Sequence, residues 1–374
     1  MTQTSIILSI GSNKGDRLVN IRECIALIHR KVATVIKVSR LYQTPAWGFE
    51  GEAFYNAALL VHSHKSAERV LQEVLDIEKE LGRTRSEATT YESREIDIDI
   101  IAYGNQVIKT ENLEVPHPRM HQRHFVLQPL LDLQLDYIHP ILKRTVVELI
   151  KECPDDNSYE VISSLESPIE EYRLEQFNNI VIEGNIGAGK TTLATKIAED
   201  FNAKLLLEGF ADNPFLPKFY EDKARYALPL EMSFLADRYQ QLSDDLTQLD
   251  LFKKFIVSDY YIFKSLIFSR VTLQEDEYRL YHRIFEIMYK EIPKPDLYVY
   301  LYQNTAQLLA NIKKRGRSYE QEIPSDYLDK INKGYLEYIK QQKELNIIVI
   351  DVSDKDFVEN QEDYIAILET LTKC

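Results

Sequence analysis

The segment Gly184-Asn-Ile-Gly-Ala-Gly189-Lys190-Thr191 most constrains the fold of this 374-residue chain. An apolar run, 179–183, precedes it and a helical pattern follows to residue 201, which predicts a strand, a glycine-rich loop and a helix. In such a loop successive backbone N–H groups surround a polyphosphate, while Lys190 reaches the outer phosphates and the Thr191 hydroxyl holds Mg²⁺. The second half is therefore predicted to bind ATP through Gly184, Asn185, Ile186, Gly187, Ala188, Gly189, Lys190, Thr191 and Thr192. A loop of this kind leaves the reaction open, because kinases, motors and switches all use it.

The apolar runs predict a different fold for each half of the chain. In the second half, runs at 204–207, 255–258, 297–302 and 347–352 are separated by long helical patterns, as in a parallel sheet flanked by helices. In the first half, short runs at 6–9, 35–39, 57–61 and 96–102 alternate with helical periodicity at 18–30 and 67–81, as in a small α+β domain.

The length of the chain suits two domains better than one. A polar stretch with two prolines and several serines and acidic residues lies between the halves and reads as a linker over 152–176. We therefore expect an N-terminal domain at 1–151 and a C-terminal domain at 177–374.

Composition excludes several classes of partner. The net charge is −14, whereas a nucleic-acid backbone needs a basic face, so we expect no nucleic-acid binding. No apolar stretch approaches about 18 residues, so no membrane span is expected. Three widely spaced cysteines and a start without a secretory pattern indicate a cytoplasmic protein.

Two aspartates alternate with isoleucines in Ile96-Asp97-Ile98-Asp99-Ile100. A strand sends successive side chains to opposite faces, so Asp97 and Asp99 share one face. Paired carboxylates suit Mg²⁺, which keeps several waters and takes its other ligands from phosphate oxygens. From these residues alone, an ordinary edge strand with a solvated face is an equally good interpretation.

The order of further segments favours the metal site. Gly11-Ser12-Asn13, Tyr42-Gln-Thr44-Pro45, Phe54-Tyr-Asn56, Leu81-Gly-Arg83, Arg94-Glu-Ile-Asp97-Ile-Asp99 and Val115-Pro-His117-Pro-Arg119 follow one another along the chain. This order resembles the 6-hydroxymethyl-7,8-dihydropterin pyrophosphokinase family of folate biosynthesis over residues 5–150. The resemblance implies a ferredoxin-like α+β fold, Mg²⁺ at Asp97 and Asp99, and transfer of the β,γ-diphosphate of ATP to the pterin hydroxymethyl group with release of AMP.

The same resemblance assigns roles to individual residues. It places Arg83 and Arg94 near the phosphates and His117 and Arg123 on ATP. It places the pterin against Thr44, Phe54, Asn56 and Phe125. Arginine suits the first role because its fork pairs with phosphate oxygens, and a flat ring suits aromatic faces with one buried amide.

Three segments of the second half resemble the deoxynucleoside kinase family over 178–345. They are Leu207-Glu208, the stretch 225–238, and Lys314-Arg315-Gly-Arg317-Ser-Tyr-Glu320. The resemblance implies that Glu208 activates the sugar 5′-hydroxyl, that Arg315 and Arg317 neutralise the transferring phosphoryl group, and that Asp259 has a metal or phosphate role. It also implies that Glu320 contacts the sugar and Arg238 the base. Plainer alternatives are a surface glutamate at 208, a solvated basic turn at 313–317, and an Arg238 paired with Asp237 or Asp245.

Three positions depart from that family. Glu231 stands where a glutamine usually contacts the base, and an ionised carboxylate only accepts hydrogen bonds. Tyr260 and Asn311 stand where arginines are frequent. The departures leave base preference and turnover open.

Three hypotheses follow for the whole chain. The first is a bifunctional Mg-ATP-dependent enzyme that diphosphorylates the dihydropterin and phosphorylates deoxynucleosides, with a homodimer formed through the C-terminal domain. In the second, the C-terminal half is a noncatalytic nucleotide-sensing or oligomerisation module. In the third, it is a kinase for another small acceptor.

Overall fold

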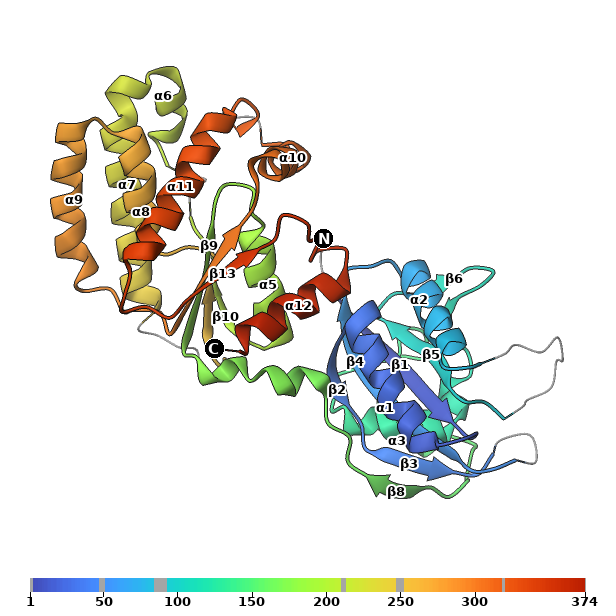
Figure 1. Cartoon of the computed structure of the whole chain (residues 1–374). Coiled ribbons are helices and arrows are strands. Elements are labelled where there is room, and N and C mark those ends of the chain that lie inside the picture. The colour runs from blue at the N-terminus through green and yellow to red at the C-terminus, as the bar shows by residue number, and fades with distance from the viewer. Residues whose placement is uncertain are drawn as a thin grey trace. The chain divides into compact units, whose positions relative to one another are not determined.

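The computed structural model describes residues 3–46, 51–83, 93–209, 213–246, 252–317 and 320–373. The chain divides into two compact units (Figure 1), and each is described by itself. The first unit comprises Met1–Arg173 together with Phe357–Lys373, and the second comprises Leu174–Asp356.

An antiparallel sheet organises the first unit. Its central strand β1 (Thr4–Ser12) pairs with β4 (Phe54–Ser63) on one side and with β5 (Asp97–Tyr103) on the other. Both β2 (Thr34–Val38) and β3 (Leu41–Thr44) pair with β4, and β8 (Glu160–Ser163) extends the sheet beside β3. A short hairpin of β6 (Ile108–Lys109) and β7 (Glu114–Val115) is separate.

Helices cover both faces of this sheet because its strands alternate apolar side chains between two cores. Ile6, Leu8 and Ile10 of β1 pack in one core with α1 (Arg17–Leu27) and α2 (Ala67–Glu80). Ile7 belongs to the opposite core, which α3 (His124–Asp132) and α4 (Val146–Glu152) supply. The strands and helices expected in the first half are thus confirmed as an α+β unit.

The predicted division of the chain differs from the observed one. Residues 152–176 do not form a separate linker, because β8 lies within them and belongs to the first sheet. The Ser167 hydroxyl also donates to the carbonyl of Val35, 3.0 Å away. The polar composition of 152–176 suggested a connector, because the apolar pair Val161-Ile162 in β8 is short and stays largely exposed at the edge of the sheet.

The last helix, α12 (Gln361–Leu371), also belongs to the first unit. It packs against the π-helical turn Ile28–Val32 and the 3₁₀ helix Pro168–Tyr172. The buried Gln361 amide donates to the His29 carbonyl and to the Thr34 hydroxyl, each at 3.1 Å. The predicted C-terminal domain at 177–374 therefore ends in a helix that packs with the first unit.

Replacing Gln361 by alanine is expected to destabilise the first unit by about 1–3 kcal/mol, because two buried groups would lose a donor. The temperature that half-inactivates pterin turnover should fall by several degrees. Glu369→Gln, an exposed change on the same helix, should leave that temperature unchanged. Equal behaviour of the two variants would contradict the assignment of α12 to this unit.

The second unit is built on a fully parallel sheet in the order β10-β11-β9-β12-β13. Its strands are β9 (Asn179–Gly184), β10 (Lys204–Leu206), β11 (Ile256–Ser258), β12 (Leu297–Tyr302) and β13 (Ile347–Asp351). The helices are α5 (Lys190–Asp200), α6 (Leu216–Glu221), α7 (Lys223–Asp245), α8 (Phe263–Thr272), α9 (Glu275–Tyr289), α10 (Thr305–Arg315) and α11 (Ser325–Gln341). This confirms the predicted parallel sheet flanked by helices, and ligands of such sheets bind beyond the carboxyl ends of the strands.

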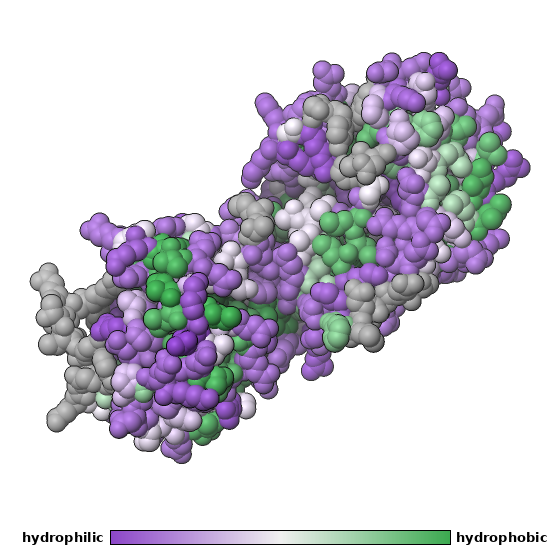
Figure 2. Space-filling model, turned by 180° about the vertical axis from the view of Figure 1, so that it is seen from behind, coloured by the Kyte–Doolittle hydropathy of each residue, from purple (hydrophilic) through white to green (hydrophobic). Residues whose placement is uncertain are grey.

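Within the described residues, no helix is both long and apolar enough to cross a membrane. Hydrophilic residues cover most of the face shown in Figure 2, with smaller hydrophobic groups between them.

Candidate active sites

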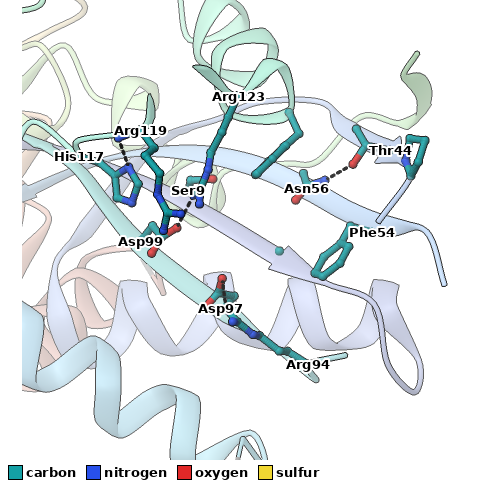
Figure 3. Close-up of a pocket in the computed structure, with 13 residues that line it drawn as sticks. Ser9, Thr44, Phe54, Asn56, Arg94, Asp97, Asp99, His117, Arg119 and Arg123 are labelled. Atoms are coloured by element: carbon teal, nitrogen blue, oxygen red, sulfur yellow. Dashed lines mark hydrogen bonds and ion pairs between the residues drawn. The ribbon is translucent and has the colours of Figure 1, made fainter. Parts of the chain in front are cut away.

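A pocket in the first unit brings together residues from strands far apart in the sequence (Figure 3). The two β5 carboxylates lie on its floor, while Thr44 of β3 and Phe54 and Asn56 of β4 lie at its other end. The full lining is Ser9, Gly11, Thr44, Pro45, Phe54, Asn56, Arg94, Asp97, Asp99, His117, Arg119, Arg123 and Phe125. One end is therefore charged, and the other carries an aromatic ring and an amide.

Two arginines hold Asp97. Arg83 donates to Oδ1 at 2.6 Å and Arg94 to Oδ2 at 2.7 Å. Arg83 also pairs with the buried Glu78. The structure thus places both predicted phosphate-binding arginines beside the predicted metal ligand, although Arg83 itself does not line the pocket.

Asp99 has weaker cationic partners than Asp97. Burial and the neighbouring Asp97 carboxylate raise the pKa of Asp99 above its usual range, and Arg123 opposes this from 3.7 Å. A carboxylate that lies beside Asp97 and has its paired arginine 3.7 Å away is one that a divalent ion would stabilise.

The predicted metal site therefore fits Mg²⁺. Among the residues that the structure describes, no group of three or more His, Cys, Asp and Glu side chains could hold a metal ion. Mg²⁺ needs only one or two protein carboxylates when phosphate oxygens and water complete its shell. Asp97 and Asp99 would hold it.

Asn13 fixes the segment that carries Arg94. Its backbone N–H donates to the Arg94 carbonyl, and its side-chain oxygen accepts from the Arg94 N–H at 2.7 Å. Its amide also donates to the Ser93 hydroxyl and the Glu52 carbonyl. The Asn13-Lys-Gly turn after β1 therefore positions a charged group eighty residues later in the chain.

His117 stays neutral near neutral pH. Burial and the adjacent Arg123 and Arg119 lower its pKa to about 4. Its Nδ1 accepts the Arg119 N–H at 3.2 Å. A neutral ring beside cationic guanidinium groups keeps a hydrogen-bonding edge without adding to their repulsion.

The opposite end of the pocket presents an oriented amide. Asn56 donates to the Thr44 hydroxyl at 2.8 Å, which leaves its carbonyl oxygen as an acceptor. Gly11 makes room for it, because a Cβ on Gly11 would lie 2.9 Å from that oxygen. Phe54 and Phe125 line the same region, and Arg123 lies over the Phe125 ring at 5.5 Å.

In the second unit, the glycine-rich loop joins β9 to α5 as predicted. Gly187 and Gly189 have φ near +85°, a region that favours glycine. A Cβ on Gly184 or Gly187 would lie within 3 Å of a backbone oxygen. The Asn185 side chain bonds to the Leu328 carbonyl and to Asn332, so it anchors the loop to α11.

Lys190, Thr191 and Asp259 meet at the carboxyl end of the sheet. Lys190 donates to the Asn185 carbonyl at 2.9 Å, and burial lowers its pKa to about 8. The Thr191 hydroxyl donates to Asp259, and the other Asp259 oxygen accepts the Glu208 N–H at 2.8 Å. Asp259 thus joins the phosphate loop to the strand end that carries Glu208.

Glu208 is a paired buried carboxylate, contrary to the surface alternative. Arg238 donates to Oε1 at 2.7 and 3.0 Å, and Lys264 of α8 donates to Oε2. Although burial favours the neutral form, Lys264 and Arg238 hold the pKa of Glu208 well below its usual range. Arg238 therefore pairs with Glu208, and neither Asp237 nor Asp245 is its partner in the structure.

The basic segment after α10 faces the same pocket. Arg315 and Arg317 both pair with Glu320, and all three side chains line the pocket with Lys190 and Glu208. The alternative interpretation, a solvated basic turn at 313–317 that belongs to no binding site, is therefore wrong for Arg315 and Arg317. The predicted sugar contact, Glu320, lies between two predicted phosphoryl contacts.

The three unusual positions have distinct surroundings. Tyr260 is fully buried in the core of the second unit and does not line the pocket. Asn311 donates to the Gly187 carbonyl at 2.9 Å and so supports the phosphate loop. Glu231 does line the pocket, buried on α7.

Sequence reasoning missed several pocket residues. In the first unit they are Ser9, Gly11, Pro45 and Arg119, all within or beside quoted motifs. In the second they include Lys264, Phe268 and Thr272, spaced at i, i+4 and i+8 on α8. That spacing was the available signal. Thr192, predicted on the nucleotide, is exposed and does not line the pocket.

Both sites combine clustered cationic side chains with carboxylates and an adjoining pocket, and one adds a glycine-rich loop between a strand and a helix. This defines the protein as a nucleotide-dependent phosphotransferase with two separate sites.

Comparison with known families gives each site a class. Residues 180–374 match the Deoxynucleoside kinase family and residues 7–135 match the 7,8-dihydro-6-hydroxymethylpterin-pyrophosphokinase (HPPK) family. The chain belongs to both families and is a fusion of the two, a bifunctional kinase.

Two sequence relatives agree with this division. Deoxyguanosine kinase of Bacillus subtilis is 38% identical over 189 residues, which cover 50% of this chain and 91% of the relative. The 2-amino-4-hydroxy-6-hydroxymethyldihydropteridine pyrophosphokinase of Aquifex aeolicus is 37% identical over 145 residues, which cover 38% of this chain and 89% of the relative. A structure of deoxyadenosine kinase from M. mycoides with bound dATP aligns at 26% identity and a TM-score of 0.46 over 52% of this chain and 98% of that one.

Proposed function

We propose that the first unit transfers the diphosphate of Mg-ATP to 6-hydroxymethyl-7,8-dihydropterin and that the second phosphorylates deoxynucleosides at the 5′-hydroxyl with Mg-ATP. The observation that carries the first part is one pocket with paired carboxylates at one end and the Asn56–Thr44 pair at the other. The observation that carries the second is Glu208 held by Lys264 and Arg238 in a pocket shared with Lys190.

In the first unit, the pterin ring lies against Phe54 and Phe125, and Asn56 bonds to its edge. The hydroxymethyl oxygen attacks the β-phosphorus, the bond from that phosphorus to the α-phosphate oxygen breaks, AMP leaves, and the hydroxyl proton passes to solvent. Mg²⁺ bound by Asp97 and Asp99 would neutralise and align the phosphates. Arg83 and Arg94, which hold Asp97 in this structure, would turn part of their hydrogen bonding to phosphate oxygens.

In the second unit, the 5′-oxygen attacks the γ-phosphorus, the bond from that phosphorus to the β-phosphate oxygen breaks, ADP leaves, and the hydroxyl proton passes to solvent once the new bond has formed. Lys190, Arg315 and Arg317 stabilise the charge on the transferring group. Mg²⁺ would be held by Thr191, with Asp259 beside it. Glu208 accepts the hydrogen bond of the 5′-hydroxyl and orients it.

The low pKa of the Glu208 carboxyl indicates which catalytic role this side chain has. A carboxylate with a very low pKa is a weak base, so early proton removal gains little from it. Phosphoryl transfer has a loose transition state in which the nucleophile needs orientation more than deprotonation. Lys264 and Arg238 therefore position Glu208 as an acceptor and reduce its basicity.

Glu208→Gln tests catalysis against a noncatalytic module. We expect nucleoside phosphorylation to fall by about 100-fold or more, as for loss of a group that orients the attacking hydroxyl, while ATP binding persists. Because glutamine leaves Arg238 and Lys264 without a charged partner, Glu208→Asp serves as a second variant that keeps the charge but shortens the side chain. Full turnover in both variants would refute the assigned role of Glu208, and ATP binding without turnover of any deoxynucleoside by the unmodified chain would favour the module.

The remaining parts of the proposal rest on family resemblance and charge. The strand order β5-β1-β4 with β2 and β3 beyond it is consistent with a ferredoxin-like first unit. We propose a cytoplasmic homodimer formed through the second unit. The net charge of −14 supports the absence of nucleic-acid binding.

A further inference from the structure

Two helices of the second unit form the walls of one slot. Glu231, Phe234 and Arg238 lie on one face of α7 at spacings of three and four residues, and Lys264, Phe268 and Thr272 follow a four-residue spacing on α8. All six line the same pocket, and the two helices are in contact.

The slot has a polar group at each end and aromatic rings between them. At one end, Arg238 and Lys264 both bond to Glu208. At the other end, the Glu231 carboxyl lies near Thr272, whose hydroxyl donates to the Phe268 carbonyl at 2.8 Å. Seven residues of α-helix separate Glu231 from Arg238, a rise of about 10 Å. A flat ligand whose reacting hydroxyl lies at Glu208 would pass Phe234 and Phe268 and present its far edge to Glu231.

Glu231 is a buried carboxyl without a cationic partner. Its exposed fraction is 5%, and within the described part of the chain no cation forms an ion pair with it. Arg238, the nearest candidate on the same helix, is committed to Glu208 and to the Ser265 hydroxyl at 2.7 Å. A buried carboxylate is costly unless donors satisfy it, so the pocket favours a ligand that brings donors of its own.

We propose that Glu231 selects the base, and that its carboxylate binds guanine through the adjacent ring N–H and exocyclic amino groups. The inference rests on the proposed nucleoside kinase activity of this pocket. Guanine offers two parallel donors to the two carboxylate oxygens, a bidentate match of the strong, charge-assisted kind. Thymine offers one N–H flanked by carbonyl oxygens that would repel the carboxylate.

The protonated form of Glu231 has the opposite preference. A carboxylic acid offers one donor and one acceptor, which matches the ring nitrogen and amino group of adenine or cytosine. Burial raises the pKa of Glu231 to about 7, and the opposing effects of Arg238, Thr272 and Lys264 are smaller. Guanine binding should therefore strengthen as the pH rises through 7, and adenine binding should weaken.

Other charged or titratable groups surround this carboxyl on every side of the pocket. The Tyr281 hydroxyl of α9 donates to the Glu231 backbone carbonyl at 3.4 Å, and burial raises the pKa of Tyr281 above its usual range. The groups that share the pocket are Arg238 on α7, Lys264 on α8, Glu208 after β10, Lys190 on α5, Asp259 after β11, Arg315 at the end of α10, Arg317 and Glu320 between α10 and α11, and Tyr327 on α11. Among these pocket groups, Glu231 is the carboxyl whose pKa is raised to about 7.

Calorimetric titration of the full chain with deoxyguanosine and with deoxyadenosine tests the inference directly. In buffers of different ionisation enthalpy at pH 7, deoxyguanosine binding should release about half a proton and deoxyadenosine binding should take up about half a proton. Between pH 6 and pH 8 the affinity ratio of guanine to adenine should rise roughly 100-fold.

Glu231→Gln should abolish both proton exchanges and flatten the pH profile, whereas Glu286→Gln, an exposed change on α9, should preserve them. Binding of both nucleosides with no proton exchange, or with exchange of one sign, would overturn the role of Glu231 while leaving the kinase proposal standing. Failure of every deoxynucleoside to bind would instead overturn the proposed function. If Glu231 had only a structural role, Glu231→Gln would lower the stability of the protein. It would not remove proton release with deoxyguanosine and proton uptake with deoxyadenosine.

Discussion

Replacing Asp97 by asparagine is expected to lower the rate of pterin diphosphorylation about 1,000-fold. Asp97 shares one face of β5 with Asp99 and has both arginines within 2.7 Å, so it is the most strongly supported ligand of the pocket. An amide cannot supply the negative charge that holds Mg²⁺, and the metal contributes several kcal/mol of transition-state stabilisation. Release of AMP from ATP in the presence of the dihydropterin measures the effect.

Asp76→Asn serves as the matched control, because Asp76 is an exposed aspartate on α2. It should leave both activities unchanged. Deoxynucleoside phosphorylation by the Asp97 variant should also stay at the level of the unmodified chain. A rate of AMP release within a few-fold of the unmodified rate would contradict the metal site.

Replacing Lys190 by alanine is expected to lower deoxynucleoside phosphorylation about 100- to 1,000-fold, the usual effect of removing one preorganised group that stabilises transition-state charge. Lys190 is half-buried at the loop and donates to the Asn185 carbonyl. The phosphates of ATP would replace that carbonyl and favour the charged amine. Formation of ADP with each of the four common deoxynucleosides measures the loss.

The control for Lys190→Ala is Lys333→Ala on the exposed face of α11, which should leave the rate of ADP formation unchanged. Pterin diphosphorylation should persist in both lysine variants. An unchanged rate of ADP formation in the Lys190 variant would contradict the role of the loop.

Local patterns in the sequence predicted much of this molecule. The glycine-rich loop was predictable because strand, loop and helix follow one another directly over residues 179–200. The shared face of Asp97 and Asp99 followed from the two-residue period of a strand. The two fold classes followed from apolar runs that alternate with helical spacing.

Long-range packing was not predictable in the same way. Nothing local shows that α12 joins the first unit, because its apolar face would suit either core. The polar residues that flank the short strand β8 concealed an edge strand. Tyr260 looked like a lost cation in the site, yet it lies in the core, and Lys264 supplies the second cation to Glu208 from the next helix. In each case the contacts that decide the structure join segments that are far apart in the sequence.

A single measurement tests the central claim that one chain carries two independent phosphotransferase sites. The unmodified chain, Asp97→Asn and Lys190→Ala are each incubated with Mg-ATP, the dihydropterin and the deoxynucleosides together, and AMP and ADP are quantified. We predict both products from the unmodified chain, ADP without AMP from the Asp97 variant, and AMP without ADP from the Lys190 variant. Loss of both products in either folded variant, or formation of AMP alone by the unmodified chain, would contradict the account.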